Sequence, residues 1–209
     1  MCSIFGSSDP DEFFELSDLN QSRGVHAWSW AGVFRDRKTP HKGDKGKGKF
    51  PQNISLTGCD GDYYLGHVQT RTGTDSGMHP AVSQTHNYWL FHNGILLPDF
   101  VPENVQWDTQ YLLDFIIGDG SPDYVWYVDK LSQIRGSFAC VLVTPELILV
   151  FRNDNAPLYY RGSTISSVEF EGSQPVPANH VHVLNLHRNE LQPCKHGEFT
   201  NADTMYRIT

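Results

Sequence analysis

The stretch MCSIFGSS (residues 1–8) places an apolar segment directly behind the start methionine. Chain ends are usually polar and frayed, so Ile4, Phe5 and Gly6 predict a buried strand at the start of the fold. Two interpretations of Cys2 are open, an inert small apolar side chain or a nucleophile. If Met1 is removed, Cys2 carries its own α-amino group, whose usual pKa is about 7.7–8.0. That amine can accept the thiol proton near neutral pH, so one residue would supply both nucleophile and base.

The composition favours one domain over residues 1–209, built from strands and turns. Of the 209 residues 39% are hydrophobic and 12% aromatic, with 18 Gly and 12 Pro, which suits β-structure better than a helical bundle. A net charge of −8 argues against general coating of nucleic acid. No apolar run reaches the roughly 20 residues of a membrane span, and no signal peptide is recognisable. Four scattered cysteines without a C-x-x-C pair fit a reducing compartment, so we expect a cytoplasmic protein.

Strand and helix patterns follow one another without a βαβ rhythm. Strands are predicted at 2–6, 25–35, 62–70, 87–96, 136–144, 146–153, 157–162 and 180–186, and helices at 9–21, 107–120 and 123–134. Residues 36–54 are rich in Lys and Gly and predict a mobile loop, and residues 187–209 form a C-terminal tail that either docks or frays. This order predicts an α+β fold with antiparallel sheets.

Three features suggest chemistry, and each has an ordinary alternative. HNGI (92–95) offers the Asn93 side-chain amide and the Gly94 N–H as an oxyanion hole, or it is a turn that breaks the strand. Arg71 and Asp108 are charge partners for a polar substrate, or a surface arginine and a helix N-cap. The histidines His67, His79, His86 and His92 have no zinc-motif spacing, so no metal site or other cofactor is expected.

Eight short motifs together carry a family resemblance, from Met1 to about Leu186. In order they are MCSIFG, SRGVHAWSWAGV, LGHVQTRTGT, MHP, FHNGIL, DTQYL, GSFACVLV and RNDNAPLYY. Each is weak alone, but the ordered series resembles the glutaminase domain of class II glutamine amidotransferases, which are N-terminal-nucleophile (Ntn) hydrolases. The resemblance implies a four-layer αββα sandwich of two antiparallel sheets.

The resemblance also implies a role for each matching residue. Cys2 would be the nucleophile, and Asn93 with Gly94 the oxyanion hole. Arg23 would support the nucleophile end, and Asp108 would hold the α-ammonium of glutamine. On the same basis, the candidate substrate-binding residues are Arg71, Asp108, Gln69, Arg23 and His92.

Several positions depart from the family pattern. Gln69 stands where the family has the arginine that binds the glutamine α-carboxylate. Arg71 lies two residues further on, and residues i and i+2 of an extended segment face the same side, so Arg71 is a candidate substitute. Ser3 replaces a glycine, His26 and Ala27 stand where Asp and Ser are usual, and Gln110 replaces a glutamate.

The leading functional prediction is hydrolysis of the glutamine side-chain amide to glutamate and ammonia. An acceptor-activating partner would be a separate chain, or the protein acts alone. One alternative is an Ntn amidohydrolase that acts on another amide, which the Gln69 change suggests. Another is a non-catalytic descendant that binds a partner or nucleic acid through residues 35–50, which carry seven Lys or Arg against two Asp. That segment is otherwise a solvated hairpin tip. No membrane partner is expected.

Overall fold

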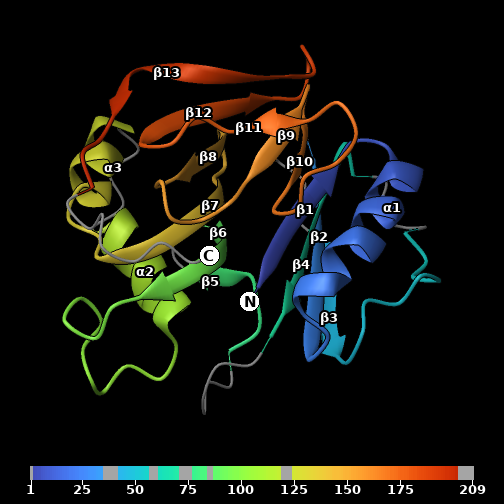
Figure 1. Ribbon diagram of the computed structural model, residues 1–209, viewed down its shortest axis with the longest axis horizontal. Coiled ribbons are helices and arrows are strands. Elements are labelled where there is room, and N and C mark those ends of the chain that lie inside the picture. Colours follow the sequence, from blue (N-terminus) through green and yellow to red (C-terminus); the bar gives the residue numbers. More distant parts are fainter. Residues whose placement is uncertain are drawn as a thin grey trace.

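Two antiparallel β-sheets stack face to face in the computed structural model, and helices cover their outer faces (Figure 1). The structure describes residues 2–34, 42–56, 61–70, 77–83, 87–118 and 124–201. The first sheet has the strand order β11-β9-β10-β1-β4-β2-β3, and the second has the order β13-β12-β8-β7-β6-β5.

The bounds of the elements are as follows. The first sheet contains β1 (Ser3–Ser7), β2 (Ala27–Val33), β3 (Lys42–Lys47), β4 (Tyr63–Gln69), β9 (Tyr159–Arg161), β10 (Thr164–Ser166) and β11 (Gln174–Pro175). The second contains β5 (Ala81–Ser83), β6 (Tyr88–Leu96), β7 (Gly136–Val143), β8 (Ile148–Arg152), β12 (His180–Asn185) and β13 (Glu190–Glu198). The helices are α1 (Pro10–Asn20), the short 3-10 helix η1 (Gln21–Arg23), α2 (Asp108–Ile117) and α3 (Tyr124–Leu131).

Helix α1 begins where its sequence provides a cap. The Asp9 carboxylate accepts the backbone N–H groups of Asp11 and Glu12, and Pro10 occupies the first helical turn, where its missing N–H costs nothing. The apolar face of the helix packs on the first sheet through Phe13, whose ring lies 5.2 Å from that of Phe5 on β1. The first sheet is therefore covered on its outer side by α1.

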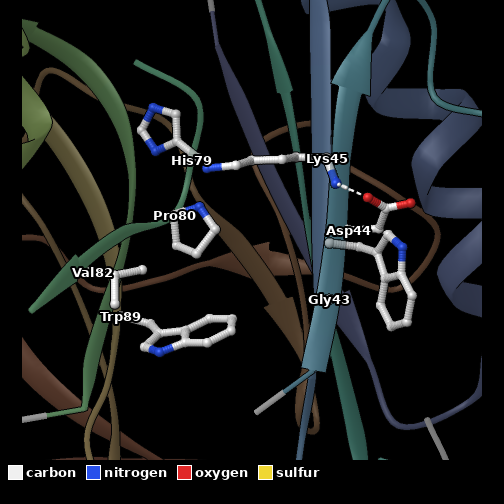
Figure 2. Close-up of a pocket in the computed structure, with 8 residues that line it drawn as sticks. Gly43, Asp44, Lys45, His79, Pro80, Val82 and Trp89 are labelled. Atoms are coloured by element: carbon white, nitrogen blue, oxygen red, sulfur yellow. Dashed lines mark hydrogen bonds between the residues drawn. The ribbon is translucent and has the colours of Figure 1, made fainter. Parts of the chain in front are cut away.

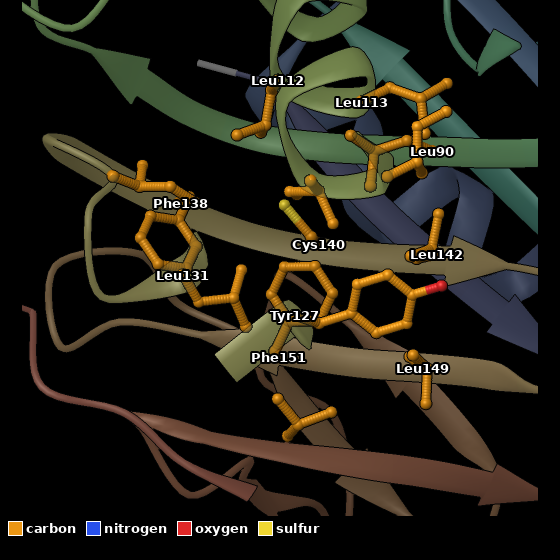
Figure 3. Close-up of a cluster of buried hydrophobic side chains, with 14 of the residues drawn as sticks. Leu90, Leu112, Leu113, Tyr127, Leu131, Phe138, Cys140, Leu142, Leu149 and Phe151 are labelled. Carbon is orange, nitrogen blue, oxygen red and sulfur yellow. The ribbon is translucent and has the colours of Figure 1, made fainter. Parts of the chain in front are cut away.

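Helices α2 and α3 cover the outer face of the second sheet in the same way. Figure 3 shows this cluster, in which Leu112 and Leu113 of α2 and Leu131 of α3 lie over β6, β7 and β8. The sheet contributes Leu90, Phe138, Cys140, Leu142, Leu149 and Phe151. None of the helices in the described part of the chain combines the length and apolar content needed to cross a bilayer.

Alternation along the strands separates the outer faces from an apolar layer between the sheets. On β1, Phe5 packs toward α1, whereas Ile4 belongs to the inter-sheet cluster with Leu65 of β4 and Phe91 of β6. The same period-2 alternation on β7 sends Ala139 and Val141 inward and Cys140 outward. Helix, sheet, sheet and helix layers result, which confirms the predicted α+β four-layer αββα architecture.

Edge strands are the main difference from the sequence-based expectation. Within the loop expected over 36–54, residues 42–47 form β3 and pair with β2. Within the tail expected over 187–209, residues 190–198 form β13 and pair with β12, while residues 202–209 lie outside the described part. Both strands are at sheet edges, where exposed Lys and Glu side chains are common and the apolar alternation that signals a strand is absent.

The Asn93-Gly94 turn is the second difference. Strand β6 runs unbroken from Tyr88 to Leu96, with Asn93 paired with Ala139 and Gly94 with Phe138 of β7. The Asn-Gly pair therefore lies within a continuous strand, where pairing with β7 outweighs its turn preference.

Replacing Phe13 by alanine is expected to lower the free energy of unfolding by about 3–5 kcal/mol, because the fully buried ring leaves a cavity among Phe5, Phe50 and Tyr64. Leu19→Ala on the exposed side of α1 is the control and is expected to change it by no more than about 0.5 kcal/mol. Urea unfolding followed by circular dichroism measures both. Equal losses in the two variants would contradict the packing assigned to α1.

Candidate active site

Cys2 lies immediately before β1, at the end of the first sheet. The register pairs Ser3 with Val68, which sets Cys2 across from Gln69 at the end of β4. Side chains two residues apart in an extended segment face the same side. Because Ile4 faces the space between the sheets, Cys2 faces it as well. The thiol is half-buried, and its Sγ lies 4.0 Å from the carbonyl oxygen of Thr70.

Arg23 and Thr70 hold the backbone at this end. The Arg23 Nε donates to the Cys2 carbonyl at 3.3 Å, and the Thr70 hydroxyl donates to the Arg23 carbonyl at 2.6 Å. Burial lowers the pKa of the Arg23 guanidinium, while the nearby Cys2 and Tyr159 oppose that effect. The Arg23 side chain thus lies beside the backbone of Cys2.

Asn93 approaches from the second sheet. It lies two residues after Phe91 of the inter-sheet core, is 2% exposed, and donates from Nδ2 to the Ser167 hydroxyl oxygen at 3.4 Å. The same oxygen accepts the Ile4 N–H at 2.9 Å, and the Ser167 N–H donates to the Ile4 carbonyl at 2.8 Å. Ser167 therefore bridges β6 and β1, which it contacts at Ile4, two residues after Cys2. This bridge brings Asn93 and Cys2 to the same end of the inter-sheet space.

Gly94 occupies a position that admits no side chain. A Cβ there would lie 2.0 Å from the Ser137 carbonyl oxygen and 2.9 Å from His92 Nε2. The contact with the Ser137 backbone is far closer than real Cβ atoms make, so this point of β6 must be glycine for β7 to pair where it does.

Three buried histidines fix β6 just before Asn93. The backbone N–H of His92 donates to His79 Nδ1 at 3.4 Å, and the His92 carbonyl accepts from His67 Nε2 at 3.1 Å. The rings of His67 and His79 stack with centroids 3.7 Å apart. In the described part of the chain, no group of three His, Cys, Asp or Glu side chains is placed to hold a metal ion.

Burial keeps these three imidazoles neutral at pH 7. It lowers the pKa of His67 to about 3 and that of His79 well below its usual value. Burial also lowers the pKa of His92, against the opposing charge of Asp108. Uncharged rings pack within the sandwich without a counter-charge, so the cluster acts as a structural clamp at neutral pH.

The predicted substrate-binding residues are only partly brought together. Asp108 is the first residue of α2 and accepts from the Thr109 hydroxyl at 3.2 Å, while that hydroxyl lies 3.2 Å from His92 Nδ1. Asp108 and the His92 ring therefore lie on the α2 side of β6, and Asn93 faces the other side. Gln69 donates from Nε2 to the Gly77 carbonyl at 3.2 Å, and Arg71 lies outside the described residues.

A cavity of about 140 Å³ opens between the sheet edges near β3 and β5 (Figure 2). In the figure, the Lys45 side chain extends from β3 toward His79, and Pro80, Val82 and Trp89 form the facing wall. The cavity reaches the histidine cluster through His79, whereas Cys2 and Asn93 are not among its lining residues.

The other described cysteines have environments that disfavour a thiolate. Burial raises the pKa of Cys140, which is fully buried, and that of Cys194. Because the thiolate is the nucleophilic form, these two thiols are poor candidates for catalysis. Cys59 lies outside the described residues.

Sequence reasoning missed Ser167 and the His67–His79 clamp. Ser167 follows the short strand β10 and lies 74 positions along the chain from its partner Asn93. A lone serine after a short strand carries no pattern that links it to a distant asparagine. The histidines lie near strands as expected, but their mutual stacking depends on how the two sheets are superposed.

No family model matches the sequence, and no curated protein matches it. Solved structures do match the fold. Glutamine phosphoribosylpyrophosphate amidotransferase from B. subtilis, complexed with ADP and GMP, superposes with a TM-score of 0.70 at 19% identity, over 93% of this chain and 49% of that chain. A structure of the allosteric regulatory enzyme of purine biosynthesis gives 0.68 at 20% identity, over 93% and 49%.

A third match is nearer in length. The glutamine aminotransferase class-II domain protein from Silicibacter pomeroyi superposes with a TM-score of 0.52 at 12% identity, over 93% of this chain and 98% of that chain. The present chain spans about half the length of the first two structures. At these identities the likenesses establish the fold, and at that level they confirm the resemblance to class II glutamine amidotransferase domains.

The histidine cluster predicts a stability that falls on acidification. The unfolded chain takes up a proton on each histidine near pH 6.5, whereas folded His67 does so only near pH 3. The stabilisation is complete above about pH 6.5 and is lost as the pH falls, by up to about 1.4 kcal/mol per pH unit for each such histidine. Urea unfolding at a series of pH values from about 7.5 to 5 measures the slope.

Two variants test whether the pH dependence of the unfolding free energy comes from the cluster of His67, His79 and His92. His67→Gln keeps a donor toward the His92 carbonyl and is expected to flatten the pH dependence. The exposed His187→Gln is expected to leave it unchanged. Equal unfolding free energies of the wild-type protein at pH 7 and pH 5 would contradict burial of neutral imidazoles.

Proposed function

We propose that this chain is a class II glutamine amidotransferase domain that hydrolyses the glutamine side-chain amide, with Cys2 as nucleophile after removal of Met1. The observation that carries the proposal is the Ser167 bridge, which holds Asn93 of one sheet to Ile4 of the other, two residues from the thiol. The shared fold supports it, since it is the fold of the amidotransferases described above.

The first half of the reaction forms a thioester. The Cys2 α-amine takes the thiol proton, and Sγ forms a bond to the amide carbon. The carbonyl oxygen gains negative charge, which the Asn93 side-chain N–H and the Gly94 backbone N–H stabilise as donors. The carbon–nitrogen bond then breaks, the α-ammonium returns its proton to the leaving nitrogen, and ammonia departs.

The second half releases glutamate. A water molecule gives a proton to the α-amine and attacks the thioester carbon, and the same two donors stabilise the second oxyanion. The carbon–sulfur bond breaks, and the thiol recovers its proton. By the resemblance, Asp108 would hold the substrate α-ammonium and Arg71 would replace the charge that Gln69 lacks. The position of Asp108 on the α2 side of β6, away from the side that Asn93 faces, does not itself support the first of these roles.

The fate of the ammonia depends on a second component. The two enzymes with the higher TM-scores are about twice as long as this chain. We propose that the ammonia is either passed to an acceptor or released. One observation favours the alternative, an Ntn hydrolase that acts on another amide. Gln69, which stands where the family has an arginine, donates from its side-chain amide to the Gly77 carbonyl.

Replacing Cys2 by alanine is expected to reduce ammonia release from glutamine to the uncatalysed level, because the attacking atom is removed. Ammonia and glutamate are measured for the wild-type protein, for C2A, and for C194A as a control that keeps its activity. A panel of other side-chain amides, asparagine and N-acetylglutamine among them, is assayed in parallel.

The pattern across the panel separates the two candidates. Glutamine as the best substrate supports the amidotransferase. Poor cleavage of glutamine beside rapid turnover of another amide, still dependent on Cys2, would replace it with the amidohydrolase. Full activity in C2A would refute both.

A further inference from the structure

One buried hydroxyl contacts both strands that carry the proposed chemistry. Ser167 directly follows β10 and is 1% exposed. Its oxygen accepts the N–H of Ile4 on β1 and a side-chain N–H of Asn93 on β6. A serine oxygen has two lone pairs, and these two bonds use both of them.

Ser167 is itself fixed to β1 by two hydrogen bonds. Its backbone N–H donates to the Ile4 carbonyl at 2.8 Å, while its hydroxyl accepts the Ile4 N–H at 2.9 Å. The Ile4 N–H thus donates to a side-chain hydroxyl, whereas a strand N–H usually donates to a backbone carbonyl. The hydroxyl therefore has a fixed position relative to the strand that leads back to Cys2.

The Asn93 amide needs such a partner to hold one orientation. The terminal torsion of an asparagine side chain is broad and only weakly restricted by itself. The amide nitrogen has two N–H donors, and the bond to Ser167 uses one and leaves the other available. An amide anchored in this way presents its second N–H in a constant direction, at the end of the inter-sheet space where Cys2 lies.

We propose that Ser167 is a positioning residue, which orients the Asn93 amide so that its second N–H meets the oxyanion formed on attack by Cys2. This inference rests on the proposed function and adds a residue to its machinery. Ser167 does not touch the substrate and acts through Asn93 alone.

The expected loss of kcat in Ser167→Ala follows from the loss of the hydrogen bond that orients the Asn93 amide. Removal of an oxyanion donor costs about 10²- to 10³-fold in kcat. In Ser167→Ala the donor stays but is free to rotate, so a smaller loss of about 10- to 100-fold in kcat is expected. The KM is expected to stay within about twofold, because the ground-state substrate gains little from this N–H.

The test compares S167A with two matched variants. Ser167→Thr keeps the hydroxyl and is expected to recover most of the lost kcat. Ser163→Ala removes an equally buried hydroxyl, which bonds Asn189 at the other end of β10, and is expected to behave as wild type. The rate of Cys2 alkylation by iodoacetamide, which forms no oxyanion, is expected to be the same in all four proteins.

Any one of three kinetic results would overturn the proposal. One is an equal loss of kcat in S167A and S163A, which would indicate a general packing effect. Another is a parallel loss of kcat and of the alkylation rate in S167A, which would indicate a displaced Cys2. The third is an unchanged kcat in S167A.

A readout without turnover separates this inference from the proposed function. In nitrogen-labelled protein, the Asn93 side-chain amide signals are assigned by their absence in Asn93→Ala. They are expected to shift and to exchange faster with water in S167A, and to stay unchanged in S163A. If the wild-type protein cleaves no amide, the proposed function fails while these signals still test the positioning; unaltered Asn93 signals in S167A would refute the positioning.

Discussion

The arrangement of this molecule depends on hydrogen bonds that cross between its two sheets at one end of an apolar interface. Along most of their length the sheets meet through side chains such as Ile4, Leu65 and Phe91. At the Cys2 end, polar groups from both sheets are buried and must find partners across the gap, because an unpaired buried polar group is costly. The Ser167–Asn93 and His67–His92 bonds satisfy that requirement. They also fix how the sheets are superposed where the proposed chemistry takes place.

This constraint explains why the backbone of β6 is held on both sides of its key residues. His79 and His67 bind the N–H and the carbonyl of His92, and Gly94 fits under the Ser137 carbonyl, where any side chain would clash. Asn93 lies between these two fixed points. A donor that must meet a developing charge is most effective when it does not reorganise during the reaction, and a central strand provides that rigidity better than the turn that the Asn-Gly pair suggests.

The sequence predicts the layers of the fold well and its edges poorly. Helix α1 and strand β4 have clear patterns, since a cap or an apolar run marks each of them. Strands β3 and β13 do not, because an edge strand needs only backbone pairing on one side and its side chains face solvent. In the site, Cys2 and Asn93 emerge from motifs, whereas Ser167 becomes visible only when the register of β1 against β10 and the facing of the two sheets are known. Arg71, the proposed substitute for the family's arginine, lies outside the described residues.

Residue 2 is proposed to be the N-terminal cysteine after removal of Met1, within reach of a glutamine-shaped ligand. The most direct test is the intact mass and the peptide map of the purified protein before and after treatment with diazo-oxo-norleucine, an electrophilic analogue of glutamine. The expected result is a chain that lacks Met1 and gains one adduct, located on Cys2 and suppressed by excess glutamine. A chain with Met1 removed that takes up no adduct on Cys2, or that is labelled instead on Cys140 or Cys194, would contradict it.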